Sequence, residues 1–519
     1  MIAIKIDVFS HNVKVHGFGY RGKEVLLEFC RTLAQYGMTR TGHNRFVRTM
    51  LRVYAATTTD RREFRFQRSQ LDDLIVHLKY HGFMDNNIEI NYRSVPVGVE
   101  VNMMLDPNLK PYDYQVPLID FLSQVPAIEV MAPDERTKVT TLQTGKGKTN
   151  CSLMACAKIG KRVMLILKGM YVEKWISDVK KAYKIEKDDL LVVRGSADLK
   201  ALMALAQAGE LKAKFIICTN KTIYNYLEAY EQYREDIVQL GYSILPEDLF
   251  GGLGVGVRLI DEVHMDFHLN YRIDLYTNVE ITINLSATLE SDDKFMNRMY
   301  EVAFPNKTRF GMEYDKYIAV RALTYRLNDL RTVRWKAKGR GSYSHLMFEE
   351  SIMKNKTLLD NYLNMITNIV ENSYVSKREE GQKMLVFAYT VELCGIIAKH
   401  LSAKYPSLKI NRYTAEEKYE VLLESDISVS TIKSAGTAVD VPGLIAVLMT
   451  DALGSRQGNS QALGRLRKFV SGPWTGLTPH FYYLVCLDIP KHIEYHERKI
   501  ENFSNKALSH KTLTTSFRI

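Results

Sequence analysis

A glycine-rich segment near residue 145 has the residue types that bind a polyphosphate. Its residues, Gly145-Lys146-Gly147-Lys148-Thr149, follow a short β-branched run and precede apolar residues at helical spacing. Glycines let the backbone turn so that several N–H groups face one anion, and a helix start adds its positive dipole end. In such a loop the lysine reaches the β- and γ-phosphates, and the threonine hydroxyl ligates Mg²⁺. The predicted phosphate-binding residues are Thr144, Gly145, Lys146, Gly147, Lys148 and Thr149.

Two adjacent carboxylates could act on a nucleotide bound by this loop. An apolar run at residues 257–260 ends in Asp261 and Glu262. Opposite a phosphate loop, Asp261 would hold Mg²⁺ through water, and Glu262 would accept a proton from the attacking water. Two alternatives stay open. The acids could simply face solvent, and because the strict loop pattern has glycine where this chain has Leu142, the Gly-Lys-Thr could be a chance surface turn.

An aromatic residue and an amide precede the phosphate loop at the start of a helical pattern. Tyr114 and Gln115 follow a proline-containing linker and open a short apolar helix. A tyrosine ring can stack on an adenine, and a glutamine can hydrogen-bond its edge. The two residues are therefore predicted to bind the base of a nucleotide, and ordinary surface positions are the alternative.

Alternating strand and helix patterns position these residues. Residues 162–167 and 214–219 are continuous apolar runs typical of buried parallel strands, and a helical pattern follows each. The same alternation returns at residues 383–388 and 427–431. The predicted fold class is therefore α/β, with two tandem parallel-sheet domains.

The ends of the chain have different patterns. Residues 1–105 combine short alternating strands with amphipathic helices, which predicts a small α+β accessory domain. The last residues are polar, and we expect them to be loosely held. The predicted domains are residues 1–105, two larger domains at 106–305 and 306–505, and a polar tail at 506–519.

Two stretches concentrate positive charge. Residues 40–68 carry eight arginines against two acids, and residues 326–341 interleave arginines and lysines with a tryptophan. Such surfaces bind nucleic-acid phosphates, and the aromatic ring can stack on bases. A solvated sheet face and a basic linker are the respective alternatives. The residues predicted to contact nucleic acid in these stretches are Arg61, Arg62, Arg65, Arg331, Arg334, Trp335, Lys336 and Arg340.

Composition narrows the class of protein. The 519 residues carry a formal charge of +11, which favours a polyanionic partner, with a basic solvated surface as the alternative. The six cysteines are scattered and several lie in apolar runs, so we expect buried free thiols in a reducing compartment. We find neither an apolar stretch long enough to span a membrane nor a secretory signal, and expect a cytoplasmic protein, a host's cytoplasm if the chain is viral.

The order of the motifs is similar to that of a known family. Gly-Lys-Thr at 147–149, Asp-Glu-Val-His at 261–264 and Ser-Ala-Thr at 286–288 resemble the first motor domain of superfamily 2 helicases and translocases, in their DEAH-like branch. The resemblance implies that Ser286 and Thr288 bond His264 and couple the nucleotide state to the grip on nucleic acid. It also places Thr219 where the family contacts the strand backbone.

Two later segments extend the resemblance. Asp440 and Pro442 fit the family's Gly-x-Asp-x-Pro, although Ala438 replaces the glycine. Residues 461–468, QALGRLRK, resemble Q-x-x-G-R-x-x-R, whose arginines reach the γ-phosphate. The last arginine position holds a lysine, which cannot form the same bidentate fork. The resemblance implies that Asp440 and Gln461 contact the nucleotide, with Arg465 as arginine finger and Arg467 as second candidate.

The resemblance implies that ATP and Mg²⁺ bind between two RecA-like domains. A small basic N-terminal domain before two motor domains resembles phage UvsW-type branch-migration DNA helicases. That resemblance implies branched DNA as substrate, namely forks, Holliday junctions and displacement loops in recombination, repair or replication. We expect the protein to bind branched or forked duplex DNA and single-stranded DNA, and not a membrane. We expect its oligomeric state to be a monomer. An RNA helicase and a nucleic-acid binding scaffold with weak ATPase stay open.

Overall fold

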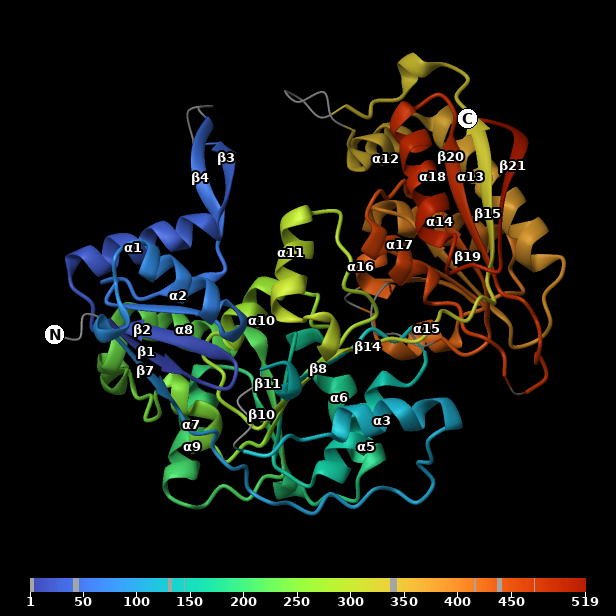
Figure 1. The fold of residues 1–519 in the computed structure, drawn as a ribbon. Coiled ribbons are helices and arrows are strands. Elements are labelled where there is room, and N and C mark those ends of the chain that lie inside the picture. Colours follow the sequence, from blue (N-terminus) through green and yellow to red (C-terminus); the bar gives the residue numbers. More distant parts are fainter. Residues whose placement is uncertain are drawn as a thin grey trace. The chain divides into compact units, whose positions relative to one another are not determined.

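The computed structural model describes residues 4–40, 46–128, 133–143, 145–336, 343–414, 417–435, 441–470 and 472–519. The chain divides into two compact units. The first holds the N-terminal sheet and a seven-stranded sheet, and the second holds another seven-stranded sheet (Figure 1). The domain boundaries near residues 105 and 305 stay predictions. Among the described residues, no helix is both long and apolar enough to cross a membrane.

The N-terminal sheet has five strands in the order β5-β6-β2-β1-β7. Alternating apolar residues such as Ile4, Ile6 and Val8 face a core shared with two helices. A separate two-stranded hairpin extends from this sheet (Figure 1). The elements are β1 (Ile4–Val8), β2 (Asn12–His16), α1 (Tyr20–Thr32), the hairpin strands β3 (Gln35–Arg40) and β4 (Phe46–Arg52), β5 (Ala55–Thr57), β6 (Glu63–Gln67), α2 (Leu71–Tyr80) and β7 (Ile88–Tyr92).

The first seven-stranded sheet has the order β10-β11-β9-β12-β13-β8-β14, and every neighbouring pair is parallel. Its strands are β8 (Thr137–Thr140), β9 (Val163–Leu167), β10 (Leu190–Val193), β11 (Phe215–Thr219), β12 (Val257–Ile260), β13 (Ile281–Leu285) and β14 (Arg309–Phe310). Its helices are α3 (Val116–Ser123), α4 (Pro133–Arg136), α5 (Lys148–Ile159), α6 (Val172–Ala182), α7 (Ser196–Gln207), α8 (Asn220–Tyr233), α9 (Leu249–Gly252), α10 (Phe267–Asp274) and α11 (Lys294–Ala303).

Both faces of this sheet are buried. In β9, Met164 and Ile166 pack with residues of α7 and α8, while the intervening Leu165 is also fully buried on the opposite face. A strand covered on both faces needs a continuous apolar run, and this explains why the sequence shows no alternation here.

The second seven-stranded sheet is also wholly parallel, in the order β17-β18-β16-β19-β20-β15-β21. Its strands are β15 (Ala319–Arg326), β16 (Lys383–Phe387), β17 (Ile410–Tyr413), β18 (Ile427–Ser430), β19 (Leu444–Met449), β20 (His480–Cys486) and β21 (Ser509–Arg518). Its helices are α12 (His345–Lys354), α13 (Lys356–Val370), α14 (Val391–Lys404), α15 (Tyr419–Glu424), α16 (Ile432–Ala435), α17 (Arg456–Leu463) and α18 (Pro490–Phe503). The predicted α/β class with two parallel-sheet domains and an N-terminal α+β unit is confirmed.

The prediction of a loosely held tail is wrong. Residues 509–518 form β21, which pairs in parallel with β15 at the edge of the second sheet. The segment is rich in threonine, whose branched side chain favours strands. The backbone N–H of Ile519 donates to the carbonyl of Arg326 at 3.0 Å, and Ile519 is only 2% exposed. The last residue therefore anchors the strand.

Candidate nucleotide and nucleic-acid sites

The predicted phosphate loop joins β8 to α5 through two glycines in the left-handed region. Gly145 has φ +87° and Gly147 has φ +81°. A β-carbon at Gly147 would come 2.3 Å from Gln115 Nε2, so only glycine fits without displacing that amide. Lys148 Nζ donates to the carbonyl of Leu142 at 2.8 Å, which joins the two ends of the loop. Thr144 lies outside the described residues.

The start of α5 fits a polyphosphate. Gly147 caps this helix without a side-chain hydrogen bond, and the first N–H groups of a helix have no partner within the helix itself. These donors and the positive dipole end point at the loop, with the Lys148 ammonium and the Thr149 hydroxyl in the first turn. The residues of the loop therefore fit the phosphates of ATP.

The sheet topology gathers the motifs at one edge. The loop follows β8, Asp261 follows β12 and Ser286 follows β13, and these strands are parallel neighbours in the order β12-β13-β8. The carboxyl ends of parallel strands share one edge of a sheet, where ligands of α/β proteins bind. Burial raises the pKa of Asp261 and lowers that of His264, and the charge of Lys148 contributes to the pKa of both groups, which is consistent with this grouping.

The Asp261 carboxylate is buried and held at both oxygens. Its Oδ1 accepts from the backbone N–H of Glu262 at 2.9 Å, and its Oδ2 accepts from the indole N–H of Trp175 at 2.7 Å. Burial raises the pKa of Asp261, and the neighbouring charge of Glu262 adds to that rise. Sequence reasoning missed Trp175, because a tryptophan on the apolar face of α6 has no motif that marks it.

Glu262 has a strained backbone at a turn. Its φ is +47°, in the left-handed region that residues with a β-carbon rarely adopt. Such strain persists where the surrounding structure holds it, and it is common at functional sites. The side chain keeps 19% of its surface exposed, and its Oε2 lies 3.4 Å from His264 Nδ1. The carboxylate is thus accessible to a water molecule.

His264 and Ser286 are in contact, and the geometry fixes the imidazole tautomer. The Ser286 hydroxyl donates to the carbonyl of Thr288 at 2.6 Å, and its oxygen lies 2.7 Å from His264 Nδ1. Since the hydroxyl has one proton, Nδ1–H is the donor to Ser286. Burial and the charge of Lys148 lower the pKa of His264 to about 4, so the ring is neutral near pH 7. The Thr288 backbone N–H also donates to the Ser286 oxygen, at 3.2 Å.

Gln115 connects the helix before the loop to the loop itself. Its Nε2 donates to the carbonyl of Lys146 at 3.0 Å, and its Oε1 accepts from the N–H of Tyr112 at 3.0 Å. The rings of Tyr112 and Tyr114 stack with centroids 5.7 Å apart, and the Lys146 ammonium lies 5.3 Å from the Tyr114 centroid. In this geometry Gln115 supports the phosphate loop, and contact of either residue with adenine stays a prediction.

Thr219 immediately precedes α8 and caps its first turn. Its hydroxyl caps α8 by accepting from the N–H of Thr222 at 3.4 Å, and it contacts the Thr222 hydroxyl at 2.6 Å. This local role is that of an N-cap. Contact of Thr219 with a nucleic-acid strand stays a prediction.

The arginine candidates lie just beyond α17 of the second unit. Arg465 is 3% exposed, and its Nε donates to the carbonyl of Gln461 at 3.4 Å. The guanidinium of Arg467 donates to the carbonyl of Gly464, and Lys468 pairs with Asp315 at 2.9 Å. Asp440 lies outside the described residues. The roles of Gln461, Arg465 and Arg467 stay predictions.

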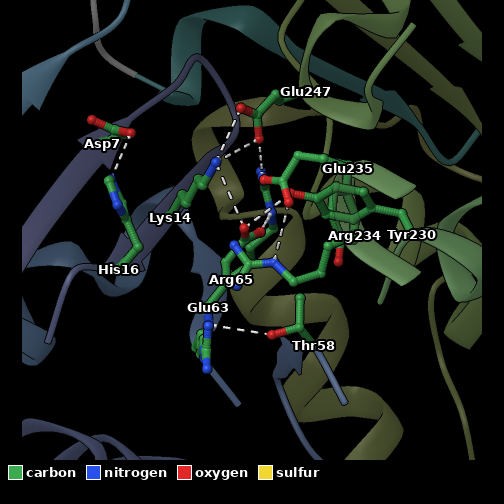
Figure 2. Close-up of polar contacts among 12 residues, drawn as sticks. Asp7, Lys14, His16, Thr58, Glu63, Arg65, Tyr230, Arg234, Glu235 and Glu247 are labelled. Carbon is green, nitrogen blue, oxygen red and sulfur yellow. Dashed lines mark hydrogen bonds and ion pairs between the residues drawn. The ribbon is translucent and has the colours of Figure 1, made fainter. Parts of the chain in front are cut away.

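The prediction that Arg65 contacts nucleic acid at the surface is wrong. Its side chain is 1% exposed and lies between two carboxylates, donating to Glu63 Oε1 at 2.6 Å and pairing with Glu247 (Figure 2). Lys14 contacts both oxygens of Glu247 at 3.0 Å, and Tyr230 donates to Glu63 Oε2 at 3.0 Å. Burial alone would raise the pKa of Glu247, but Arg65 and Lys14 lower it to about 2. This cluster joins the N-terminal sheet to α8 and to the segment before α9.

Arg65→Ala should destabilise the first unit by about 3 kcal/mol, because the buried Glu63 and the partly buried Glu247 would lose the cation that lies between them. Urea unfolding followed by circular dichroism measures the change. Arg62→Ala is the matched control, since that side chain is 79% exposed and should cost about 0.5 kcal/mol or less. Equal losses in both variants would contradict the role of the cluster.

The other predicted basic residues are mostly at the surface. Arg61 and Arg62 are exposed in the β5–β6 turn, and Arg331 pairs with Asp329 at 3.1 Å with 90% of its side chain exposed. Arg334 and Lys336 are also exposed, whereas Trp335 packs partly against the core of the second unit, which limits its availability for base stacking. Arg340 lies outside the described residues.

Comparisons with known proteins show the fold. The sequence matches no family model and no curated protein. The structure is similar to S. cerevisiae Dbp5 bound to RNA and ADP BeF3, with TM-score 0.51 and 11% identity over 79% of this chain and 94% of that one. It also matches the Pyrococcus furiosus Hef helicase domain, with TM-score 0.44 and 14% identity over 76% of this chain and 100% of that one. A third match is a fragment of a putative HsdR subunit of a type I restriction enzyme from Vibrio vulnificus, with TM-score 0.47 and 14% identity over 96% of this chain and 83% of that one. The similarity to Dbp5 shows a fold with two RecA-like parallel sheets, one following the other along the chain.

Proposed function

We propose that this chain is an ATP-driven motor that moves along nucleic acid. The observation that carries the proposal is one edge of the first parallel sheet, where Lys148, Asp261 and the His264–Ser286 contact follow neighbouring strands. A helicase fold alone would not require this arrangement of chemical groups, because function lies in the site.

The residues of the site have separate tasks in this proposal. The α5 amides and Lys148 bind the phosphates, while Thr149 and Asp261 hold the cation. When bound, Mg²⁺ neutralises phosphate charge and orients the reacting oxygens. Glu262 takes a proton from the attacking water, and Arg465 donates to the charge that develops in the transition state.

The His264–Ser286 contact would report the nucleotide state to the rest of the sheet. His264 lies between the Glu262 carboxylate and the segment after β13, so a shift of Glu262 on hydrolysis would pull on Ser286. A packed sheet edge transmits such shifts as small discrete movements. Opening and closing of the two units on successive nucleotides would then move the chain along a strand.

The test is ATP hydrolysis measured with duplex DNA, forked DNA, single-stranded DNA and RNA as activators. Stimulation by forked DNA above the other polymers supports the branched-DNA motor. Greater stimulation by RNA would identify an RNA helicase, the class suggested by the RNA-bound Dbp5 structure. Nucleic-acid binding without hydrolysis would instead identify a scaffold and end the motor proposal.

We propose that the substrate is branched DNA, held by exposed arginines of residues 40–68. In that stretch the structure describes three exposed arginines: Arg48 on the β3–β4 hairpin, which stacks 4.7 Å over the Tyr36 ring, and Arg61 and Arg62 in the β5–β6 turn. Arg65 is not among them, because it is buried in the cluster of Figure 2. Phosphate contacts of this kind give affinity without sequence choice.

Charge reversal at Arg61 and Arg62 should weaken junction binding and leave ATP hydrolysis without nucleic acid unchanged. Each lost phosphate contact should flatten the slope of log affinity against log salt by about 0.9. Binding to a four-way junction at several salt concentrations measures this slope. Lys212→Glu, an exposed position on a loop of the first unit, is the control and should leave the slope unchanged. An unchanged slope in the double variant would move branch recognition elsewhere.

A further inference from the structure

The segment after β9 contacts the loop that carries the acidic pair at three points. Trp175 Nε1 donates to Asp261 Oδ2 at 2.7 Å, the Tyr171 hydroxyl lies 3.3 Å from the Met265 sulfur, and Lys168 pairs with Asp266 at 3.1 Å. β9 and β12 are parallel neighbours, so the two segments leave the same edge of the sheet side by side. The three contacts hold the start of α6 against the acidic loop.

The indole N–H of Trp175 donates to Asp261 from a fully buried position. The side chain is 0% exposed, and a buried tryptophan N–H usually requires a hydrogen-bond partner. Asp261 itself is 8% exposed, so solvent contributes little to its orientation. Within the described part of the chain, its two oxygens accept from Trp175 and from the Glu262 backbone, one donor each.

From this geometry we infer that Trp175 is a positioning residue, whose indole N–H orients the Asp261 carboxylate toward a divalent cation. One donor on each oxygen fixes the plane of the carboxylate, and each oxygen keeps a lone pair for a cation or its water. Hydrogen bonds to metal-holding groups from outside the coordination shell commonly change metal affinity by 10–100-fold. The inference rests on the proposed function, because the cation would arrive with a nucleotide.

Trp175→Phe tests the inference, because it removes the N–H and keeps most of the aromatic volume. Binding of a fluorescent ADP analogue is measured without hydrolysis, against Mg²⁺ concentration and in EDTA. We expect the Mg²⁺ concentration for half-maximal binding to rise about 10–100-fold, with affinity in EDTA unchanged. Trp474→Phe in the second unit is the matched control and should leave the Mg²⁺ dependence as in the wild type.

Each outcome separates the two proposals. If the wild type does not bind ADP in a Mg²⁺-dependent way, the proposed function fails. If it does and Trp175→Phe keeps the same Mg²⁺ dependence, only the role of Trp175 is overturned, even where the variant is less stable.

A second measurement covers a variant that does not fold. The chain has three tryptophans, so Trp335→Phe with Trp474→Phe leaves Trp175 as the only tryptophan, which is excited at wavelengths that tyrosine does not absorb. Adding Mg²⁺ with ADP should shift its emission, and EDTA should reverse the shift. Emission that does not respond to the cation in a nucleotide-bound protein would overturn the inference.

Discussion

Glu262→Gln should bind ATP as tightly as the wild type and lose hydrolysis by about 10²- to 10⁴-fold, the usual effect of removing a general base. The substitution keeps the shape of the side chain and the strained backbone at φ +47°, and it removes only the proton acceptor. Phosphate release under saturating ATP measures the rate, and binding of a fluorescent ATP analogue measures affinity.

Glu301→Gln is the matched control for Glu262→Gln. This glutamate lies on α11 of the same unit, has 61% of its side chain exposed and pairs with Arg298 one turn earlier in the helix. The Glu301→Gln variant should hydrolyse ATP at the rate of the wild type. Near-normal turnover in Glu262→Gln would end its assignment as the base, and the neighbouring Asp261 would then be the carboxylate to test.

Arg465→Ala should lower turnover by about 10³-fold with little change in nucleotide affinity, as loss of an arginine finger does elsewhere. The reason is that a finger stabilises charge that exists only in the transition state. Single-turnover hydrolysis measures the rate, and analogue binding shows whether affinity is preserved.

Two variants control for the burial of Arg465. Because that side chain is 3% exposed, its loss could also unfold part of the second unit, so thermal unfolding is followed in parallel. Arg465→Lys keeps a charge without the planar fork, and it should stay folded yet remain slow if the fork is needed. Arg467→Ala should cost less than Arg465→Ala. The reverse order would show that Arg467 is the finger, one residue before the last arginine position of the motif, which Lys468 occupies.

Local patterns were sufficient for the elements that surround the site. Apolar runs such as residues 162–167 predict buried strands, because a strand covered on both faces needs no polar residue. Glycines before Lys148 predict a left-handed turn, because residues with a β-carbon avoid it. These properties depend on the backbone and on immediate neighbours, and one sequence therefore reveals them.

The order of motifs was also sufficient to place residues together. Strands alternating with helices give a parallel sheet, whose carboxyl ends meet at one edge. The structure accordingly brings His264 to Ser286, and the charge of Lys148 acts on both His264 and Asp261. Neither contact needs more than the topology that the sequence predicts.

Patterns within the sequence are therefore enough to predict the fold class, and they indicate what chemistry the first sheet could perform. The folded structure is needed to know which charged and polar groups are buried, and which groups they contact. Arg65 pairs with Glu247 across 182 residues, and the Trp175 indole meets Asp261 across 86. The polar segment at residues 509–518 forms β21 because its backbone pairs with the edge of β15. Burial and pairing depend on partners distant in the chain, and a local pattern contains no information about which partner folding will supply.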